Sequence, residues 1–192
     1  MPRLILASGS PYRRTQLEQL RLPFEVVEPN VDEGEWKAVV TSPRALALKL
    51  ATKKAEAVAQ SHLGSIVIGG DQLVSFESEV LGKPGTADNA VEQLLRLCGK
   101  PHDLITAVVV LHEGRLTTHV DETRLWMRAI DRESAERYVD VDRPLDCAGA
   151  YKIESLGIAL FEKIESQDHT AITGLPLLAI TRLLNERGIA VP

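Results

Sequence analysis

The sequence predicts an α/β fold in which buried strands alternate with amphipathic helices. Leu4–Ala7 is a short apolar run, followed by small residues and then by the helix-start signals Ser10 and Pro11. Such a run is typical of a strand that is covered on both faces. Residues 66–74 form a second apolar stretch, interrupted by two glycines and a carboxylate. The length of 192 residues allows a sizeable core, and we expect one folding unit over residues 1–192.

Composition argues against several classes of protein. The net charge is -5, with 44% hydrophobic and 26% charged residues, which is ordinary for a globular protein and disfavours a general binder of nucleic acid or membrane surfaces. Cys98 and Cys147 lie far apart and form no metal-ligand spacing, so we expect two reduced, buried thiols. The sequence starts without a basic and then apolar leader, and no apolar run has the length of a membrane span. We therefore expect a cytoplasmic protein.

The remaining elements follow from caps, periodicity and turn residues. Helices are expected over 11–20, 43–58, 86–97, 131–139 and 176–188, and strands over 24–27, 104–111, 115–127 and 158–164. Ser42, Thr86 and Asp131 are expected N-caps. Glu113 and Gly114 are expected to turn a β-hairpin.

The turn after the first strand has the composition of an anion site. Ser8 and Ser10 are small and polar, and they precede a helix N-terminus, where backbone N–H groups favour an anion. Arg13 and Arg14 follow at once. Cations in the first turn of a helix oppose its macrodipole, so two neighbouring arginines favour a bound anion over the alternative of a solvated first turn.

Asp71 is the candidate reactive carboxylate. Gly69 and Gly70 precede it inside an apolar run, which predicts a bulge or the close approach of a ligand and places Asp71 at a backbone irregularity. Carboxylates at strand ends of α/β proteins often face the ligand crevice, so we expect a catalytic or metal-binding role, with a turn aspartate as the alternative. Asp32 and Glu33 lie in an expected polar turn over 29–33, where spacing alone favours an exposed loop over a cation site.

Seven motifs in one order then resemble the Maf family of nucleoside triphosphate pyrophosphatases, which is related in fold to the inosine triphosphate pyrophosphatases. The motifs are LILASGSPYRR at 4–14, VDE at 31–33, LALKLATKKA at 46–55, GGDQLV at 69–74, GKP at 82–84, CAGAY at 147–151 and GLPL at 174–177. The resemblance runs nearly end to end. It implies an elongated mixed β-sheet flanked by helices, with two lobes and a central nucleotide-binding cleft.

The resemblance also implies roles for residues that are weak signals alone. It assigns the phosphates to Ser8, Ser10, Arg13 and Arg14, with Lys53 and Lys83 neutralising further phosphate oxygens. It assigns a divalent cation to Glu33 and Asp71, with Mg²⁺ favoured by the all-oxygen ligands and Mn²⁺ as the alternative. Asp71 would also accept a proton from the attacking water. Cleavage between the α- and β-phosphates would release pyrophosphate.

Three positions distinguish branches of the family, and here they are Tyr12, Gln72 and Glu154. The branch that resembles dTTP and UTP pyrophosphatases commonly has arginine, threonine and glutamine there. An aromatic face and a carboxylate suit the positive charge of a 7-methylguanine base, although the 7-methyl-GTP branch often has tryptophan at the place of Tyr12.

The sequence thus predicts a 7-methyl-GTP pyrophosphatase. The alternatives are a dTTP/UTP pyrophosphatase and a nucleotide-binding regulator of cell division with little catalysis. The expected partner is a small-molecule nucleoside triphosphate, with no nucleic acid and no membrane, and the oligomeric state stays open, a homodimer included.

Overall fold

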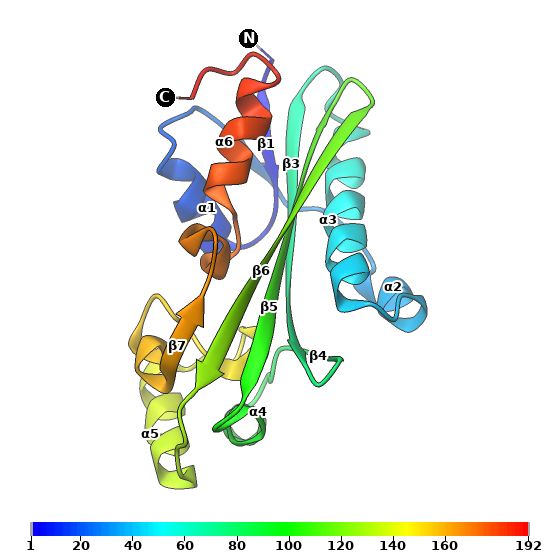
Figure 1. The fold of residues 1–192 in the computed structure, drawn as a ribbon. Coiled ribbons are helices and arrows are strands. Elements are labelled where there is room, and N and C mark those ends of the chain that lie inside the picture. Colours follow the sequence, from blue (N-terminus) through cyan, green and yellow to red (C-terminus); the bar gives the residue numbers. More distant parts are fainter. Residues whose placement is uncertain (1, 192) are drawn as a thin grey trace. The chain divides into compact units, whose positions relative to one another are not determined.

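The computed structural model describes residues 2–191 and contains a mixed β-sheet (Figure 1). The strands are β1 (Leu4–Ala7), β2 (Glu25–Val27), β3 (Ile66–Phe76), β4 (Glu79–Leu81), β5 (Pro101–His112), β6 (Arg115–Met127) and β7 (Phe161–Glu165). Their order is β2-β1-β3-β5-β6-β7, and β4 pairs with β3. β1 is parallel to β2 and β3, whereas β4 and β7 are antiparallel to their neighbours. The predicted class, a mixed sheet flanked by helices, is confirmed.

The described residues divide into two compact units. The first comprises 2–72, 106–121 and 168–191, and the second comprises 73–105 and 122–167. The helices of the first unit are α1 (Pro11–Glu18), α2 (Glu33–Val39), α3 (Pro43–Ala59), the 3₁₀ helix η3 (His169–Thr173) and α6 (Leu177–Asn185). Those of the second are α4 (Ala87–Leu97), α5 (Arg132–Asp142) and the 3₁₀ helices η1 (Ala148–Ala150) and η2 (Leu156–Leu160). The prediction of one domain over the whole chain stays a prediction.

The core of the first unit explains why its strands are apolar on both faces. One face joins β1, β3 and β5 to α1 and α6 in a single cluster that includes Leu6, Ile68, Leu17 and Ile180. The opposite face packs against α3, and Figure 1 shows α1 and α6 on one side of β1 and β3, with α3 on the other. Burial on both faces is therefore the physical reason for the continuous apolar runs.

In the second unit, α4 packs against α5, and a ring cluster anchors the chain after α5. The rings of His102, Tyr151 and Phe161 contact one another in tilted and edge-to-face arrangements at centroid distances of 5.0 to 5.9 Å, and His102 Nε2 lies 3.1 Å from the Tyr151 hydroxyl. Gly149 has φ 78°, and a Cβ there would lie 3.2 Å from Val74 Cγ2 on β3. The small residues of 147–151 therefore permit the close approach of another segment, as expected.

Local signals in the sequence place most element ends correctly. Ser10, Ser42, Thr86 and Asp131 are all N-caps whose side chains accept a backbone N–H. Glu113 and Gly114 turn the β5–β6 hairpin with φ 48° and 75°. Both cysteines are free, although they are half-buried rather than fully buried. No helix among residues 2–191 is long and apolar enough to cross a membrane.

Two expectations are wrong. The sequence predicts a turn over residues 29–33, but Glu33 begins α2, because the Asp32 side chain caps it by accepting the Gly34 N–H at 2.9 Å. Residues 158–160 belong to η2, so the last strand starts at Phe161 instead of residue 158. Of the two alternatives for Gly69 and Gly70, a bulge or a close approach, the structure shows a close approach at Gly69.

Candidate active site

The turn between β1 and α1 is folded back on itself and carries one buried hydroxyl. Ser8 is only 3% exposed, and its Oγ accepts the Ser10 N–H at 3.1 Å and Arg13 Nη1 at 3.4 Å. Ser10 Oγ accepts the Arg13 N–H at 3.4 Å as the N-cap. The structure therefore brings Ser8, Ser10 and Arg13 together, as the sequence predicts.

Arg13 is the cation of this turn. Its Nε donates to the Gly174 carbonyl at 3.1 Å, which fixes the direction of the guanidinium. Burial lowers the pKa of Arg13, while the negative charges of Asp71 and Glu33 oppose that change. Arg13 therefore stands within electrostatic reach of both candidate metal ligands.

Arg14 lies apart from this arrangement. Its side chain is 63% exposed and its Nε donates to Glu18 Oε1 at 3.1 Å, one helical turn further along α1. Arg14 already has a partner on the surface, so the argument that both arginines need an anion holds for Arg13 alone. The assignment of Arg14 to phosphate stays a prediction.

Asp71 and Glu33 share one ammonium group. Lys54 Nζ on α3 lies 2.6 Å from Asp71 Oδ1 and 2.8 Å from Glu33 Oε1. Lys37, one turn along α2, pairs with the other oxygen of Glu33 at 2.8 Å. Three elements, α2, α3 and β3, thus meet in a compact cluster of two carboxylates and two lysines.

The two carboxyl groups have opposite electrostatic environments. Burial raises the pKa of Asp71 above its ordinary value, although the charges of Lys54 and Arg13 oppose this. Burial also raises the pKa of Glu33, but the hydrogen bonds and charges of Lys37 and Lys54 outweigh it and lower the pKa to about 2. Divergent pKa values in one pair of acids are typical of sites where one group accepts a proton and the other stays charged.

Gly69 is the reason why α3 approaches this part of β3 so closely. A Cβ on Gly69 would lie 2.3 Å from the Ala51 carbonyl oxygen and 2.9 Å from Ala55 Cβ. The close approach predicted for this glycine is therefore made by a helix backbone. It brings Lys54, which lies between these two α3 residues in sequence, to Asp71.

The lysine that contacts both carboxylates is Lys54, which is not among the site residues predicted from the sequence, while the role predicted for its neighbour Lys53 stays a prediction. Lys53 Nζ pairs with Glu56 at 2.7 Å, and its ammonium lies 5.5 Å from the centre of the Trp36 ring. Lys54 is only 13% exposed. A signal for it exists, because Lys54 falls at helical spacing on the buried stripe of α3 that contains Ala47, Leu50, Ala51, Ala55 and Val58.

Gln72 follows Asp71 on β3, and its amide nitrogen donates hydrogen bonds to surrounding oxygens. Gln72 Nε2 lies 2.9 Å from Thr106 Oγ1, 2.9 Å from the Ala171 carbonyl and 3.0 Å from the Ile172 carbonyl. All four residues belong to the first unit. Gln72 therefore ties β3 to η3.

Three further predicted residues are Tyr12, Lys83 and Glu154. Tyr12 is half-buried on α1. Lys83 and Glu154 are exposed residues of the second unit, Lys83 following β4 and Glu154 following η1. The backbone near Glu154 is fixed within that unit, because the Lys152 N–H donates to the Tyr138 hydroxyl at 2.9 Å.

The Asp71–Glu33 pair suits a hard divalent cation that would be coordinated by protein carboxylates and by a substrate phosphate together. Asp71 Oδ2 is buried and has no hydrogen-bond partner among residues 2–191. No group of three or more His, Cys, Asp or Glu side chains in the described part of the chain could hold a metal ion. Two carboxylates without a complete protein cage fit Mg²⁺, which commonly takes one or two carboxylates, waters and substrate phosphates.

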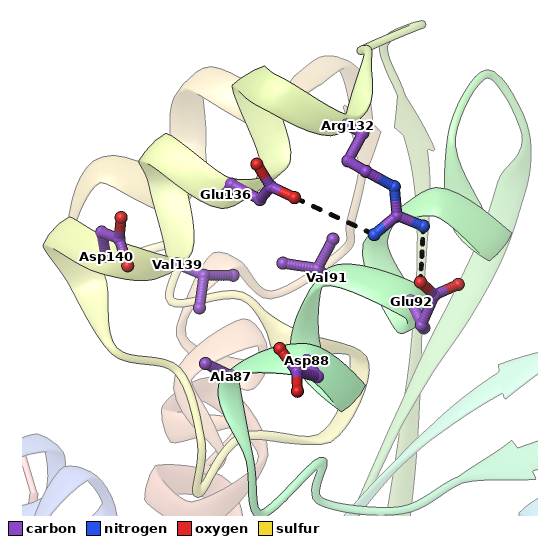
Figure 2. A pocket seen from close by; sticks show the side chains of 8 residues that line it. All are labelled: Ala87, Asp88, Val91, Glu92, Arg132, Glu136, Val139 and Asp140. Atoms are coloured by element: carbon purple, nitrogen blue, oxygen red, sulfur yellow. Dashed lines mark hydrogen bonds and ion pairs between the residues drawn. The ribbon is translucent and has the colours of Figure 1, made fainter.

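A separate pocket lies between α4 and α5 in the second unit, and Figure 2 shows its lining. Its volume is about 400 Å³, and it contains no predicted site residue. Four carboxylates and one arginine line it, together with Ala87, Val91 and Val139: Asp88, Glu92, Glu136, Asp140 and Arg132. Arg132 pairs with Glu92 at 2.6 Å and approaches Glu136 at 4.0 Å.

Comparisons with known proteins identify the family of this chain. A family model described as Maf-like protein matches residues 3–187. A 7-methyl-GTP pyrophosphatase of Bdellovibrio bacteriovorus is 47% identical over 186 residues, covering 97% of each chain. Proteins of the same name from Xanthomonas oryzae and Pseudomonas aeruginosa are 46% and 40% identical, and each comparison covers all of both chains.

Similarity to solved structures is weaker. A HAM1 protein from Coxiella burnetii is 12% identical with a TM-score of 0.43, covering 66% of this chain and 73% of the other. A nucleoside-triphosphatase / dITP/XTP pyrophosphatase from Mycobacterium abscessus is 16% identical with a TM-score of 0.43, covering 67% and 75%. We draw no conclusion from a likeness of this size.

Proposed function

We propose that this chain, which belongs to the Maf-like protein family, is a nucleoside triphosphate pyrophosphatase that hydrolyses 7-methyl-GTP to 7-methyl-GMP and pyrophosphate. Full-length relatives at up to 47% identity that carry the name 7-methyl-GTP pyrophosphatase support the substrate. The observation that carries the reaction is the cluster in which Lys54 bridges Asp71 and Glu33, with Arg13 nearby.

The side chains of this site supply a proton acceptor and cationic groups for the triphosphate. Asp71 is the proton acceptor, because its pKa is raised and its Oδ2 has a lone pair that no described residue occupies. Arg13 and Lys54 neutralise charge on the triphosphate, and the Ser8 and Ser10 turn holds Arg13 in place. Transfer of a phosphoryl group depends mainly on positioning and charge neutralisation, which these residues supply.

A divalent cation, with Mg²⁺ favoured, would be held by Glu33 and Asp71. When bound, it supplies charge neutralisation at the phosphate oxygens and lowers the pKa of a coordinated water. Glu33 remains ionised at neutral pH, since its pKa is about 2, and it is therefore the permanent anionic ligand. Lys54 would then shift its hydrogen bonds towards phosphate oxygens.

Tyr12 of the first unit and Glu154 of the second unit each offer a group that would favour a 7-methylguanine base. Methylation at N7 gives guanine a positive charge, which an aromatic ring attracts and a carboxylate pairs with. The Glu154 carboxylate is exposed. A cationic base therefore suits this chain better than the neutral pyrimidines of dTTP and UTP.

Pyrophosphate release across a nucleotide panel tests the proposal. We expect the highest kcat/KM for 7-methyl-GTP, and a selective fall for this substrate in Glu154→Gln of about tenfold, the effect of one lost charge-assisted contact. Glu162→Gln is the matched control, since Glu162 is an exposed glutamate of β7 in the same unit. Faster hydrolysis of dTTP and UTP than of 7-methyl-GTP would contradict the proposed substrate and leave the proposed reaction class unchanged.

A further inference from the structure

Two glutamines hold the segment that runs from η3 to Gly174. Gln16 on α1 is 5% exposed, its Oε1 accepts the Leu175 N–H at 3.0 Å, and its Nε2 donates to the Thr170 carbonyl. Gln72 on β3 donates to the carbonyls of Ala171 and Ile172 from the other side. The segment is therefore fixed both to a helix and to the sheet of the first unit.

The orientation of the Gln72 amide follows from its neighbours. Two of the three oxygens around Nε2 are backbone carbonyls, which only accept hydrogen bonds, so the NH₂ end must face them. The third oxygen, Thr106 Oγ1, gives its own hydrogen to the Ala171 carbonyl at 2.9 Å. Both donor hydrogens of Gln72 are thus committed to protein oxygens, and these bonds fix the amide between β3 and η3.

The braced segment ends at the group that directs Arg13. Gly174 has φ 109°, its carbonyl accepts Arg13 Nε at 3.1 Å, and a Cβ on Gly174 would lie 3.3 Å from Arg13 Cγ. Arg13 in turn reaches Ser8 Oγ with Nη1 and acts electrostatically on Asp71. A displacement of η3 would therefore move the guanidinium away from the Ser8 turn.

We propose that Gln72 is a positioning residue that sets the place of the Arg13 guanidinium through η3 and Gly174. This inference rests on the proposed function, because it assumes that Arg13 binds the triphosphate. It explains why an amide, which can bond to two carbonyls at once, stands beside Asp71. Its effect is felt by the phosphates and is independent of the base.

Affinity for magnesium tripolyphosphate, which has no base, tests this role. We expect Gln72→Met, which is similar in length but cannot donate, to weaken tripolyphosphate binding by about tenfold in calorimetry. The kcat/KM values for 7-methyl-GTP and for GTP should both fall, since the two substrates share the triphosphate that Arg13 binds. Thr106→Val, which removes the Thr106–Ala171 hydrogen bond, should show the same pattern more weakly and serves if Gln72→Met does not fold.

A double-mutant cycle tests whether the effect passes through Arg13. In an Arg13→Met background, Gln72→Met should cause no further loss of tripolyphosphate affinity, because the group that it positions is gone. Asn185→Ala is the control, since the Asn185 side-chain amide on α6 also holds a backbone segment, but its hydrogen bonds among residues 2–191 go to Val191 and not to η3.

Each outcome decides the matter. Additive losses in the double mutant, or unchanged tripolyphosphate affinity in Gln72→Met, would overturn the positioning role and leave the proposed function standing. A parent protein that binds no tripolyphosphate in the presence of Mg²⁺ would overturn both.

Discussion

Replacing Lys54 by methionine, with Lys53→Met as the matched control, tests the assignment of the buried lysine. The two residues are neighbours on α3, but Lys54 contacts Asp71 and Glu33, whereas Lys53 pairs with Glu56. The substitution keeps helix propensity and most of the side-chain length. Its effects should therefore come from the lost ammonium group.

The structure gives the size of the stability effect. Glu33 has a pKa of about 2 against an ordinary 4.5, and this difference is worth about 3 kcal/mol. Lys37 contributes part of it, and solvent screens the interaction because 37% of the Glu33 side chain is exposed. We therefore attribute about 1 kcal/mol to Lys54. The 2.6 Å bond to buried Asp71 adds about 2 kcal/mol. Lys54→Met should thus lower the free energy of unfolding by about 3 kcal/mol, and Lys53→Met by less than about 0.5 kcal/mol.

Urea unfolding at pH 7 and steady-state kinetics measure both effects. Turnover of 7-methyl-GTP should fall at least about 100-fold in Lys54→Met, because a preorganised cation next to the phosphates is lost, and should stay within about threefold in Lys53→Met. Far-UV circular dichroism at the assay temperature controls for unfolding. Equal losses in the two variants, or a larger loss in Lys53→Met, would refute the placement of Lys54 in the site.

Two further predictions concern β3. Gly69→Ala should lower the free energy of unfolding by about 3 kcal/mol in urea, because its Cβ would lie 2.3 Å from the Ala51 carbonyl oxygen, whereas Gly82→Ala, with nothing within 4 Å in the described residues, should change it by less than about 0.5 kcal/mol. Asp71→Asn should abolish turnover without loss of stability at pH 8. Because the folded-state pKa of Asp71 is raised above the unfolded value, its contribution to stability is present at low pH and is lost as pH rises through the folded pKa, so removing the charge costs nothing at pH 8. Because the pKa of Asp71 is raised, turnover by the parent protein should increase with pH through a pKa above 3.8. An Asp71→Asn protein that is as active as the parent with Mg²⁺ would refute the role of Asp71 as proton acceptor.

Local signals make much of the fold predictable. Caps and turns depend on neighbouring residues only, so Ser42 and Thr86 mark their helices correctly in the sequence. The short helix α2 escapes prediction because the carboxylate of Asp32 suits a turn and an N-cap equally well. The glycines of β3 are informative only in part: a close approach can be predicted from the sequence, but which segment approaches, here α3, depends on the tertiary structure.

The site shows the same limit at the scale of one residue. A motif match identifies the segment that contains Lys53 and Lys54 but does not tell which of the two side chains faces the site. Successive side chains of a helix point about 100° apart, so the two lysines face different surroundings. Helical periodicity supplies that direction, and it places Lys54 on the same stripe as Leu50, Ala51 and Val58. A lysine on a buried stripe needs a carboxylate from another element, and Asp71, in its apolar run, is a carboxylate that needs a cation. Lys54 and Asp71 therefore carry opposite charges that each need a buried partner. Both features are visible in the sequence, so the pair can be predicted without the structure.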